Sequence, residues 1–326
     1  MKKQFFIFLL LLPLFSIAQK FTPKEIIRFE AEAKRVTIVR DNWGVPHIYG
    51  KTDADAVFGL MYAQCEENLK GIEHNYLYQL GRQSEADGEG ILDTDVQLQL
   101  IADSADAIRD YQNSAPGFKK LMDAFADGMN YYLYKHPGFK PLVFHHYQPW
   151  YALMFTDGSV AATITGGISL NETRDFYISG PEKLGSVKEI KKGNIEDGLN
   201  EREIGSNGFA IAPAKSASGH ALLYINPHVP FYFRGEVQIV SEEGLNAYGA
   251  VTWGQFFIYQ GFNPHSGWMH TSSYADVADL YEEKVSKKGN QWYYEYDGQQ
   301  KPVVARQLVL KVKEGDKLTP KTITGY

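Results

Sequence analysis

The apolar residues in the first half of the chain recur at helical spacing. Between residues 53 and 80 they return every three or four positions, and Thr52 with Asp55 forms a candidate capping box at the start. The same period runs through residues 107–134 and is broken at Pro116-Gly117. We therefore predict that helices dominate this part of the chain.

Strand patterns flank the helical part. Short β-branched and aromatic runs at residues 36–40 and 47–49 surround a turn sequence, which predicts two strands at a sheet edge. Residues 180–205 contain five glycines and many charges but almost no large apolar side chains, which predicts an exposed linker. Beyond it, strands are predicted at residues 208–211, 221–225, 238–240, 248–252, 256–259, 280–285, 292–296 and 303–312.

The first residues have the pattern of a secretory signal. Lys2 and Lys3 precede an apolar run that ends in small residues up to Ala18, which is typical of a cleavable signal peptide. The run is about half the length that spans a bilayer, so we expect no membrane span. No cysteine stands directly after the cleavage site, so we expect no lipid anchor and a mature chain that begins at Gln19. These features predict a periplasmic or secreted protein from which residues 1–18 are removed.

The composition is that of an ordinary globular protein. Hydrophobic residues make up 44% of the chain and charged residues 22%, with a formal net charge of -6, which excludes a disordered or fibrous class. No basic stripe is visible, so we expect no nucleic-acid partner. Cys65 is the only cysteine, so we expect a buried structural thiol and no internal disulfide.

Three separated segments resemble one protein family. Directly after the linker, GSNGFAIAPAKSASGHALLYINPHVPF is similar to the start of the catalytic chain in the penicillin acylase family of N-terminal nucleophile hydrolases. RDNWGVPHIYGKTDADAVFGLMYAQCEENL resembles the opening segment of that family, and GWMHTSSYADVADLYEE resembles the strand that carries part of its oxyanion hole. Gly205-Ser206-Asn207 alone is a common turn, but the three segments occur in the order found in the family.

The resemblance implies an α+β fold of the N-terminal nucleophile hydrolase type, an αββα sandwich that this chain contains only in part. Residues 19–180 would form a mostly helical α chain, residues 181–205 an excised spacer, and residues 206–326 the first part of the catalytic β chain. In this family the α and β chains of one precursor form a heterodimer. Family members continue well beyond the position of Tyr326, so we expect a fragment. The oxyanion asparagine and its supporting arginine would lie in the part that follows.

Ser206 is the predicted nucleophile. A serine hydroxyl attacks only after a base removes its proton, and an N-terminal serine carries its own base, because an α-amine titrates at about pH 8. Cleavage of the Gly205–Ser206 bond would create that amine, so the resemblance implies autoproteolytic maturation. Gly205 has no side chain where the hydroxyl must bend back on the preceding carbonyl, a geometry that is easier for glycine.

The same resemblance gives roles to His228, Ser272 and Val229. His228 would orient the amine and hydroxyl, Ser272 would give a backbone N–H to the oxyanion, and Val229 would line the acyl pocket. A turn histidine after Pro227 and an ordinary core valine are the alternative interpretations of His228 and Val229.

A calcium site is predicted in the same way. Asp276 and Asp279, with the carbonyl of Ala278 between them, match a calcium-binding segment of penicillin-type members, and Glu172 matches a distant ligand by approximate position. Oxygen ligands suit this hard cation. Two aspartates three positions apart are otherwise a solvated turn, so both interpretations stay open. No organic cofactor is predicted.

Together these features predict an exported acylase that cleaves the amide of an N-acyl substrate through an acyl-enzyme on Ser206. The candidate substrates are small molecules: acyl-homoserine lactones, β-lactams and lipopeptides. By the same resemblance, a histidine at position 228 favours members that act on acyl-homoserine lactones, cephalosporins and cyclic lipopeptides over those that act on benzylpenicillin. A second hypothesis is an exported ligand-binding protein of the same fold that has lost catalysis. A third is a metal-dependent hydrolase that uses His145, His146 and His228, although no zinc-motif spacing accompanies them.

Overall fold

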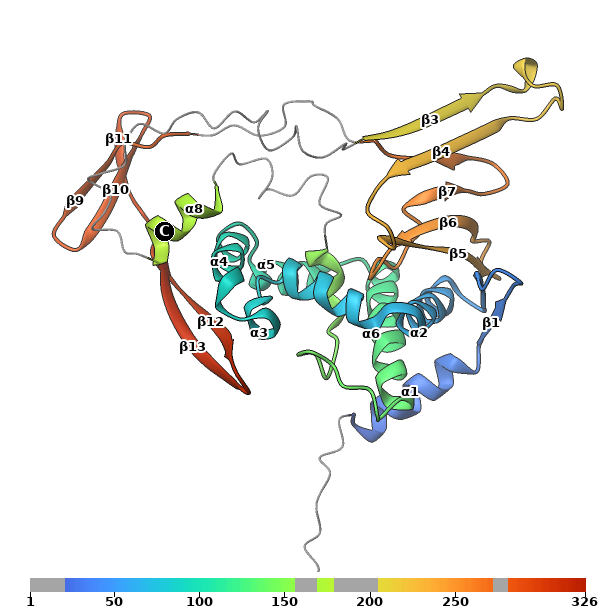
Figure 1. Cartoon of the computed structure of the whole chain (residues 1–326), viewed down its shortest axis with the longest axis horizontal. Coiled ribbons are helices and arrows are strands. Elements are labelled where there is room, and N and C mark those ends of the chain that lie inside the picture. Colours follow the sequence, from blue (N-terminus) through green and yellow to red (C-terminus); the bar gives the residue numbers. More distant parts are fainter. Residues whose placement is uncertain (1–20, 156–168, 179–204, 272–280) are drawn as a thin grey trace, which may run out of the picture.

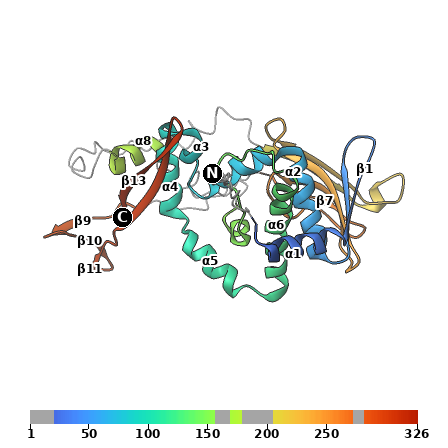
Figure 2. The same cartoon turned by 90° about the horizontal axis from the view of Figure 1, so that it is seen from below.

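The chain folds into a helical first half and a mostly β second half. The computed structural model describes residues 21–155, 169–178, 205–271 and 281–326. Helices occupy the middle of the molecule, and strands lie at both ends (Figure 1 and Figure 2). The helices described are α1 (Pro23–Ala33), α2 (Asp53–Gln79), α3 (Ser84–Asp87), α4 (Leu92–Ile101), α5 (Ser104–Asn113), α6 (Pro116–Lys135) and α8 (Leu170–Thr173), with the short turns η1 (Glu89–Ile91), η2 (Pro149–Met154), η3 (Arg174–Ile178) and η5 (Pro213–Lys215). Within these ranges, no helix has the length and apolar character that a membrane span requires.

Helix α2 confirms the predicted helix and its cap. The Thr52 hydroxyl accepts a hydrogen bond from the Asp55 backbone N–H, and the Asp55 carboxylate accepts one from the Thr52 backbone N–H, both at 3.1 Å. The helix bends at Asn68, whose side-chain oxygen accepts from the Gly71 N–H at 3.1 Å. The predicted break at Pro116 is also confirmed, because α6 begins there and proline lacks the N–H that a helix interior needs.

Helices α2 and α6 form the main core. Phe58, Met61 and Cys65 of α2 and Phe125 and Met129 of α6 are almost completely buried in one cluster. Burial raises the pKa of the Cys65 thiol. The cysteine is free and buried, which confirms the predicted structural thiol.

Helix α1, which the sequence analysis does not predict, is attached to α6 by an ion pair. Arg28 donates from Nε and Nη2 to the two carboxylate oxygens of Asp127, at 2.5 and 2.7 Å. One carboxyl oxygen of Glu32 is buried without a hydrogen-bond partner. Burial, together with the charge of Asp127, raises the pKa of Glu32 to about 8. This carboxyl group is therefore largely protonated at neutral pH, which keeps a second negative charge out of the interface.

A six-stranded sheet joins the two halves of the chain. Its strands, in spatial order, are β1 (Val36–Arg40), β2 (Pro46–Gly50), β5 (Arg234–Ser241), β6 (Asn246–Thr252), β7 (Gln260–Phe262) and β8 (Gly267–Trp268). Strand β2 pairs in parallel with β5, and the other neighbours are antiparallel. Buried aliphatic side chains, among them Ile48, Leu60 and Val237, pack the sheet on α2. The predicted position of β1 at a sheet edge is confirmed.

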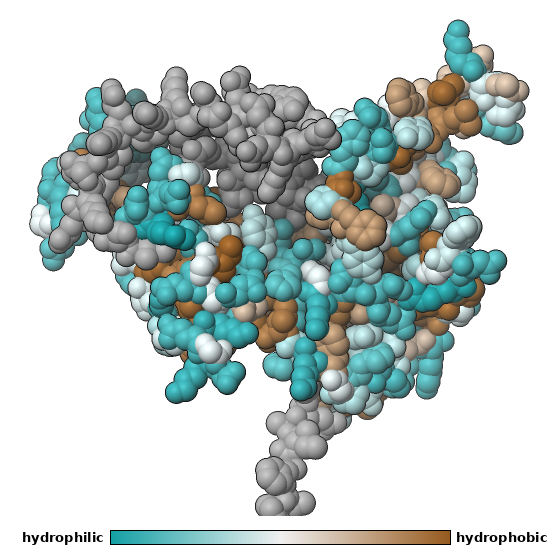
Figure 3. Space-filling view, in the orientation of Figure 1, coloured by the Kyte–Doolittle hydropathy of each residue, from teal (hydrophilic) through white to brown (hydrophobic). Residues whose placement is uncertain are grey.

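The remaining strands form three smaller units. They are the hairpin of β3 (Gly205–Ile211) and β4 (Leu222–His228), the three-stranded sheet of β9 (Val285–Lys288), β10 (Gln291–Tyr296) and β11 (Gln299–Pro302), and the hairpin of β12 (Arg306–Glu314) and β13 (Lys317–Gly325). Leu308, Leu310 and Val312 of β12 are buried in a cluster with residues of α4. The β3–β4 hairpin projects from the molecule and exposes apolar side chains (Figure 3). The mixed helix and sheet content confirms the α+β class, whereas the αββα sandwich stays a prediction.

The predicted strand at residues 256–259 is wrong. This segment is a loop between β6 and β7, and Gly254 makes the sharp turn before it with φ 102°. Phe256 packs against Phe125 of the helical core, with ring centroids 6.0 Å apart, while Ile258 enters the core of the sheet. In a strand, side chains two positions apart lie on the same face, so Phe256 and Ile258 could not enter different cores from a strand.

Other strand boundaries also differ from the prediction. Residues 281–284 of the predicted strand 280–285 are not in a strand, and β9 begins at Val285. Residues 303–305 separate β11 from β12. Strands β7, β8, β11 and β13 are not predicted. Strands β7 and β8 have only three and two residues, and β11 and β13 contain few apolar side chains, so none of them shows a distinct apolar alternation.

Gly128 of α6 allows a close approach to α2. A Cβ atom at this position would lie 2.4 Å from the Phe58 carbonyl oxygen. We expect Gly128→Ala to force the helices apart and to lower the free energy of unfolding by about 1–3 kcal/mol.

Gly117→Ala in the same helix is the matched control. Nothing lies within 4 Å of a Cβ at Gly117, so this variant should be neutral or stabilising by up to about 1 kcal/mol. Urea unfolding measures both variants. Equal stabilities would contradict the close contact at Gly128.

Candidate active site

The β3–β4 hairpin brings Ser206 and His228 to the same end of two paired strands. In the antiparallel register, Gly205 lies opposite His228 and Ser206 lies opposite Pro227. The predicted nucleophile and the predicted orienting histidine therefore become neighbours through backbone pairing alone.

Two asparagine side chains surround His228. Nδ2 of Asn207 lies 3.3 Å from His228 Nε2, and Nδ2 of Asn226 lies 3.4 Å from the same atom. Amide nitrogens only donate, so in this arrangement Nε2 accepts and Nδ1 carries the ring proton. The sequence analysis did not assign these asparagines a role. Their positions in the sequence could have indicated them, because Asn207 directly follows Ser206 and Asn226 directly precedes Pro227, the residue before His228.

Thr271 connects the segment after β8 to the nucleophile. Its hydroxyl donates to the carbonyl oxygen of Ser206 at 3.1 Å. Gly208 of β3 permits this close contact, because a Cβ atom there would lie 2.6 Å from the sulfur of Met269, the residue directly after β8. From the sheet, Nε2 of Gln260 donates to the carbonyl of His270 at 2.9 Å. The described residues that follow β8, 269–271, therefore lie beside β3.

Four predicted site residues lie outside the described residues. Ser272 follows Thr271 directly in the sequence, and Asp276, Ala278 and Asp279 fall in the same range, 272–280. The oxyanion donor and the calcium segment therefore stay predictions.

The carboxylate of Glu172 has a structural role as a helix cap. Its Oε2 accepts from the backbone N–H and the hydroxyl of Ser169, at 2.7 and 2.8 Å, at the start of α8. In both views α8 lies on the opposite side of the molecule from the β3–β4 hairpin (Figure 1 and Figure 2). Val229, directly after β4, is 37% exposed, so it is not part of the core of the described residues.

The histidines of the metal-hydrolase hypothesis do not form a cluster. His146 Nε2 lies 2.8 Å from Glu25 Oε1 of α1, whereas His228 lies in β4. Among the residues that the structure describes, no group of three or more His, Cys, Asp or Glu side chains is placed to hold a metal ion. The described part of the chain thus gives this hypothesis no support.

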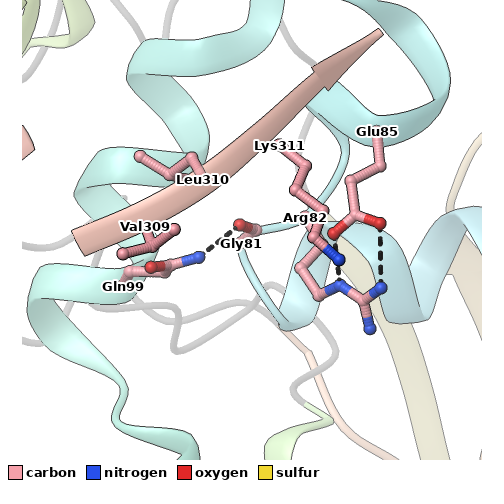
Figure 4. A pocket seen from close by; sticks show the side chains of 7 residues that line it. All are labelled: Gly81, Arg82, Glu85, Gln99, Val309, Leu310 and Lys311. Carbon is pink, nitrogen blue, oxygen red and sulfur yellow. Dashed lines mark hydrogen bonds and ion pairs between the residues drawn. The ribbon is translucent and has the colours of Figure 1, made fainter. Parts of the chain in front are cut away.

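A pocket beside β12 is lined by residues that the sequence analysis did not select (Figure 4). Arg82 and Glu85 line it and form a bidentate ion pair at 2.6 and 2.9 Å, and Gln99 donates to the Gly81 carbonyl at 2.8 Å. Arg82 and Glu85 are therefore engaged with each other. We place the candidate active site at the β3–β4 hairpin instead.

Comparison with known proteins identifies the family. The family model described as penicillin amidase matches residues 35–325. The chain therefore belongs to the penicillin amidase family.

Several relatives show the extent of the similarity. Acyl-homoserine lactone acylase QuiP of Pseudomonas fluorescens is 28% identical over 318 residues, which cover 86% of this chain and 39% of that protein. Acyl-homoserine lactone acylase PvdQ of the same species is 24% identical over 301 residues, with coverages of 86% and 38%. The chain thus spans about two fifths of the length of these relatives. The solved thermostable penicillin G acylase from Alcaligenes faecalis aligns with a TM-score of 0.36 and 18% identity, over 52% of this chain and 92% of that one.

Thr271→Val tests the contact between the segment after β8 and the nucleophile. Valine keeps the shape of threonine without the donor, so the Ser206 carbonyl loses its bond, and we expect a loss of about 1 kcal/mol in unfolding free energy. Thr271→Ser keeps the donor and serves as the control. Chemical denaturation measures both, and a loss in Thr271→Ser with none in Thr271→Val would attribute the contribution of Thr271 to its methyl group rather than to the hydrogen bond.

Proposed function

We propose that the full-length protein is an exported acylase that hydrolyses the amide of an N-acyl substrate through an acyl-enzyme on Ser206. Family membership supports this proposal, and so do the relatives, which are named as acyl-homoserine lactone acylases. The observation that carries it is the meeting of Ser206, His228 and Thr271 at one end of the β3–β4 hairpin.

Maturation would begin with an attack by Ser206 on its own preceding peptide bond. The Ser206 hydroxyl oxygen attacks the Gly205 carbonyl carbon, the C–N bond breaks, and an ester forms as the α-amine is released. Water then hydrolyses the ester, which leaves Gly205 with a free carboxylate at the end of a spacer, residues 181–205. The α and β chains would stay together as a heterodimer, because β2 pairs with β5 and α2 packs on the sheet independently of the spacer.

Turnover would use the amine that maturation creates. The α-amine of Ser206 takes the hydroxyl proton while the oxygen attacks the acyl carbonyl, and it then passes that proton to the leaving amine. The backbone N–H of Ser272 would stabilise the oxyanion, an interaction worth about 3 to 4 kcal/mol when one donor is lost. His228, with Nε2 held by two asparagine amides, would orient the amine and hydroxyl. Water finally hydrolyses the acyl-enzyme.

We also propose a structural calcium ion held by Asp276, the carbonyl of Ala278 and Asp279. The ion would neutralise two carboxylates in the segment that continues from Thr271, and oxygen donors of this kind suit it. Glu172 is a weaker candidate ligand, because its Oε2 already caps α8.

Chelation should lower the melting temperature of the matured enzyme more than its initial rate. Calcium at 100 times its dissociation constant would add about 2.7 kcal/mol to the free energy of unfolding. Asp276→Asn should remove this response. If the variant and the unaltered enzyme respond identically to calcium, the ion binds elsewhere.

The acylase assignment predicts a specific loss of activity in Ser206→Ala. We expect the full-length gene product to release fatty acid and free amine from an N-acyl-homoserine lactone, and Ser206→Ala to reduce this rate about a thousandfold or more. Ser218→Ala, in the loop that connects β3 and β4, is the control and should keep its activity. Chromatography of the two products measures the rate. An inactive unaltered protein that still binds the lactone in calorimetry would instead support the ligand-binding hypothesis.

A further inference from the structure

Glu32 lies between two arginines that both pair with other carboxylates. Arg28 precedes it by four positions in α1 and Arg35 follows it by three, spacings at which side chains on a helix meet. Arg28 nevertheless donates to both carboxylate oxygens of Asp127 in α6. Arg35 donates from Nε to both oxygens of Asp55 in α2, at 2.9 and 3.0 Å. The two ion pairs attach α1 to its neighbouring helices and leave Glu32 between them.

An ionised Glu32 would have no partner at this interface. Its Oε2 is buried and has no hydrogen-bond partner among the residues that the structure describes. The charged groups that face it are Arg28 and Arg35 from its own segment, Asp127 from α6 and Asp55 from α2. The two arginines already balance the two aspartates, so a third carboxylate would leave one buried negative charge uncompensated, which is costly. A neutral Glu32 keeps the cluster balanced.

The proton of this cluster belongs to Glu32. Burial also raises the pKa of Asp127, but both oxygens of Asp127 accept hydrogen bonds from Arg28, which favours its ionised form. Burial, and then the charge of Asp127, raises the pKa of Glu32 from 4.5 to about 8. When α1 separates from α2 and α6, the carboxyl group of Glu32 returns to water and its pKa returns to the ordinary value. Separation therefore releases a proton between these two pH values, and it becomes more favourable as the pH rises from the lower to the higher.

The apolar contacts of α1 are limited, so its charges can decide whether it stays in place. Among the described residues, Phe29 is the only residue of α1 that is fully buried. Ile26 and Ala33 are partly buried against the same core. Elements with few buried apolar contacts open at a low free energy, well before the whole protein unfolds. Helix α1 is followed by the edge strand β1, so its opening would free the chain as far as the sheet.

We propose that Glu32 makes the docking of helix α1 dependent on pH. The neutral carboxyl group lets α1 lie against α2 and α6, and the ionised carboxylate releases it. The ion pairs of Arg28 and Arg35 hold the helix in the place where Glu32 acts. This inference concerns the first half of the chain and does not rest on the proposed acylase function.

Hydrogen–deuterium exchange of the full-length protein tests the proposal. The opening constant of α1 is obtained from the exchange of its backbone amides after correction for their intrinsic rates. It should rise about tenfold for each pH unit between about pH 5.5 and 7.5, because one proton is lost on opening, and it should level off above about pH 8. Glu32→Gln keeps the shape of the neutral carboxyl group and should largely abolish the rise.

Glu30→Gln is the matched control. Glu30 belongs to the same helix, and its partly exposed carboxylate pairs with Lys135 of α6 at 3.4 Å, so this variant should keep the full rise. Glu32→Met, with an apolar side chain of similar length, should abolish the rise as glutamine does.

Two results would overturn the proposal. An opening constant of α1 that does not change with pH in the unaltered protein would show that no proton is lost on opening. A full rise in both Glu32→Gln and Glu32→Met would place the proton on another group. A rise that is lost in these two variants and kept in Glu30→Gln would assign it to Glu32.

Discussion

The attachment of the second half of the chain to helix α2 is the constraint on which the rest of the structure depends. Gln64 of α2 donates to the Gln255 carbonyl at 2.8 Å and accepts from the Gly254 N–H at 2.9 Å. The Tyr76 hydroxyl donates to the Gly254 carbonyl and the Asn75 amide donates to the Trp253 carbonyl, each at 2.8 Å. The groups at Gln64 and Tyr76 are buried, so the loss of one partner would leave an unsatisfied polar group, at a cost of about 1–3 kcal/mol.

These contacts position the candidate site from a distance. The turn that α2 fixes carries Trp253, and Trp253 holds the loop that begins just after His228. From the other side, Gln260 of the sheet holds the segment that brings Thr271 to Ser206. The candidate site, at the exposed β3–β4 hairpin, thus takes its geometry from the core of the first half. Two chains produced by cleavage would keep this geometry, because none of these contacts involves residues 181–205.

The sequence was most informative where a pattern has a single physical meaning. The Thr52–Asp55 capping box located the start of α2, and Pro116 located the start of α6. The resemblance selected Ser206 and His228, and strand pairing places them together. The sequence could not reveal the role of Gln64, because a buried glutamine that bonds two backbone groups looks the same in a sequence as a glutamine on the surface. Residues 256–259 misled the prediction for a related reason: their apolar character was real, but it serves two cores instead of one sheet face.

The proposed maturation is tested most directly by the N-terminus of the chain that it would produce. A Ser206 that lies opposite Pro227, beside His228 and in contact with Thr271, has its proposed chemistry only if its α-amine is free. Intact-mass measurement and N-terminal sequencing of the full-length gene product should therefore find a heavy chain that begins Ser-Asn-Gly-Phe. A single uncut chain in a protein that hydrolyses N-acyl amides, or a heavy chain with another first residue, would contradict the assignment of Ser206 as an N-terminal nucleophile.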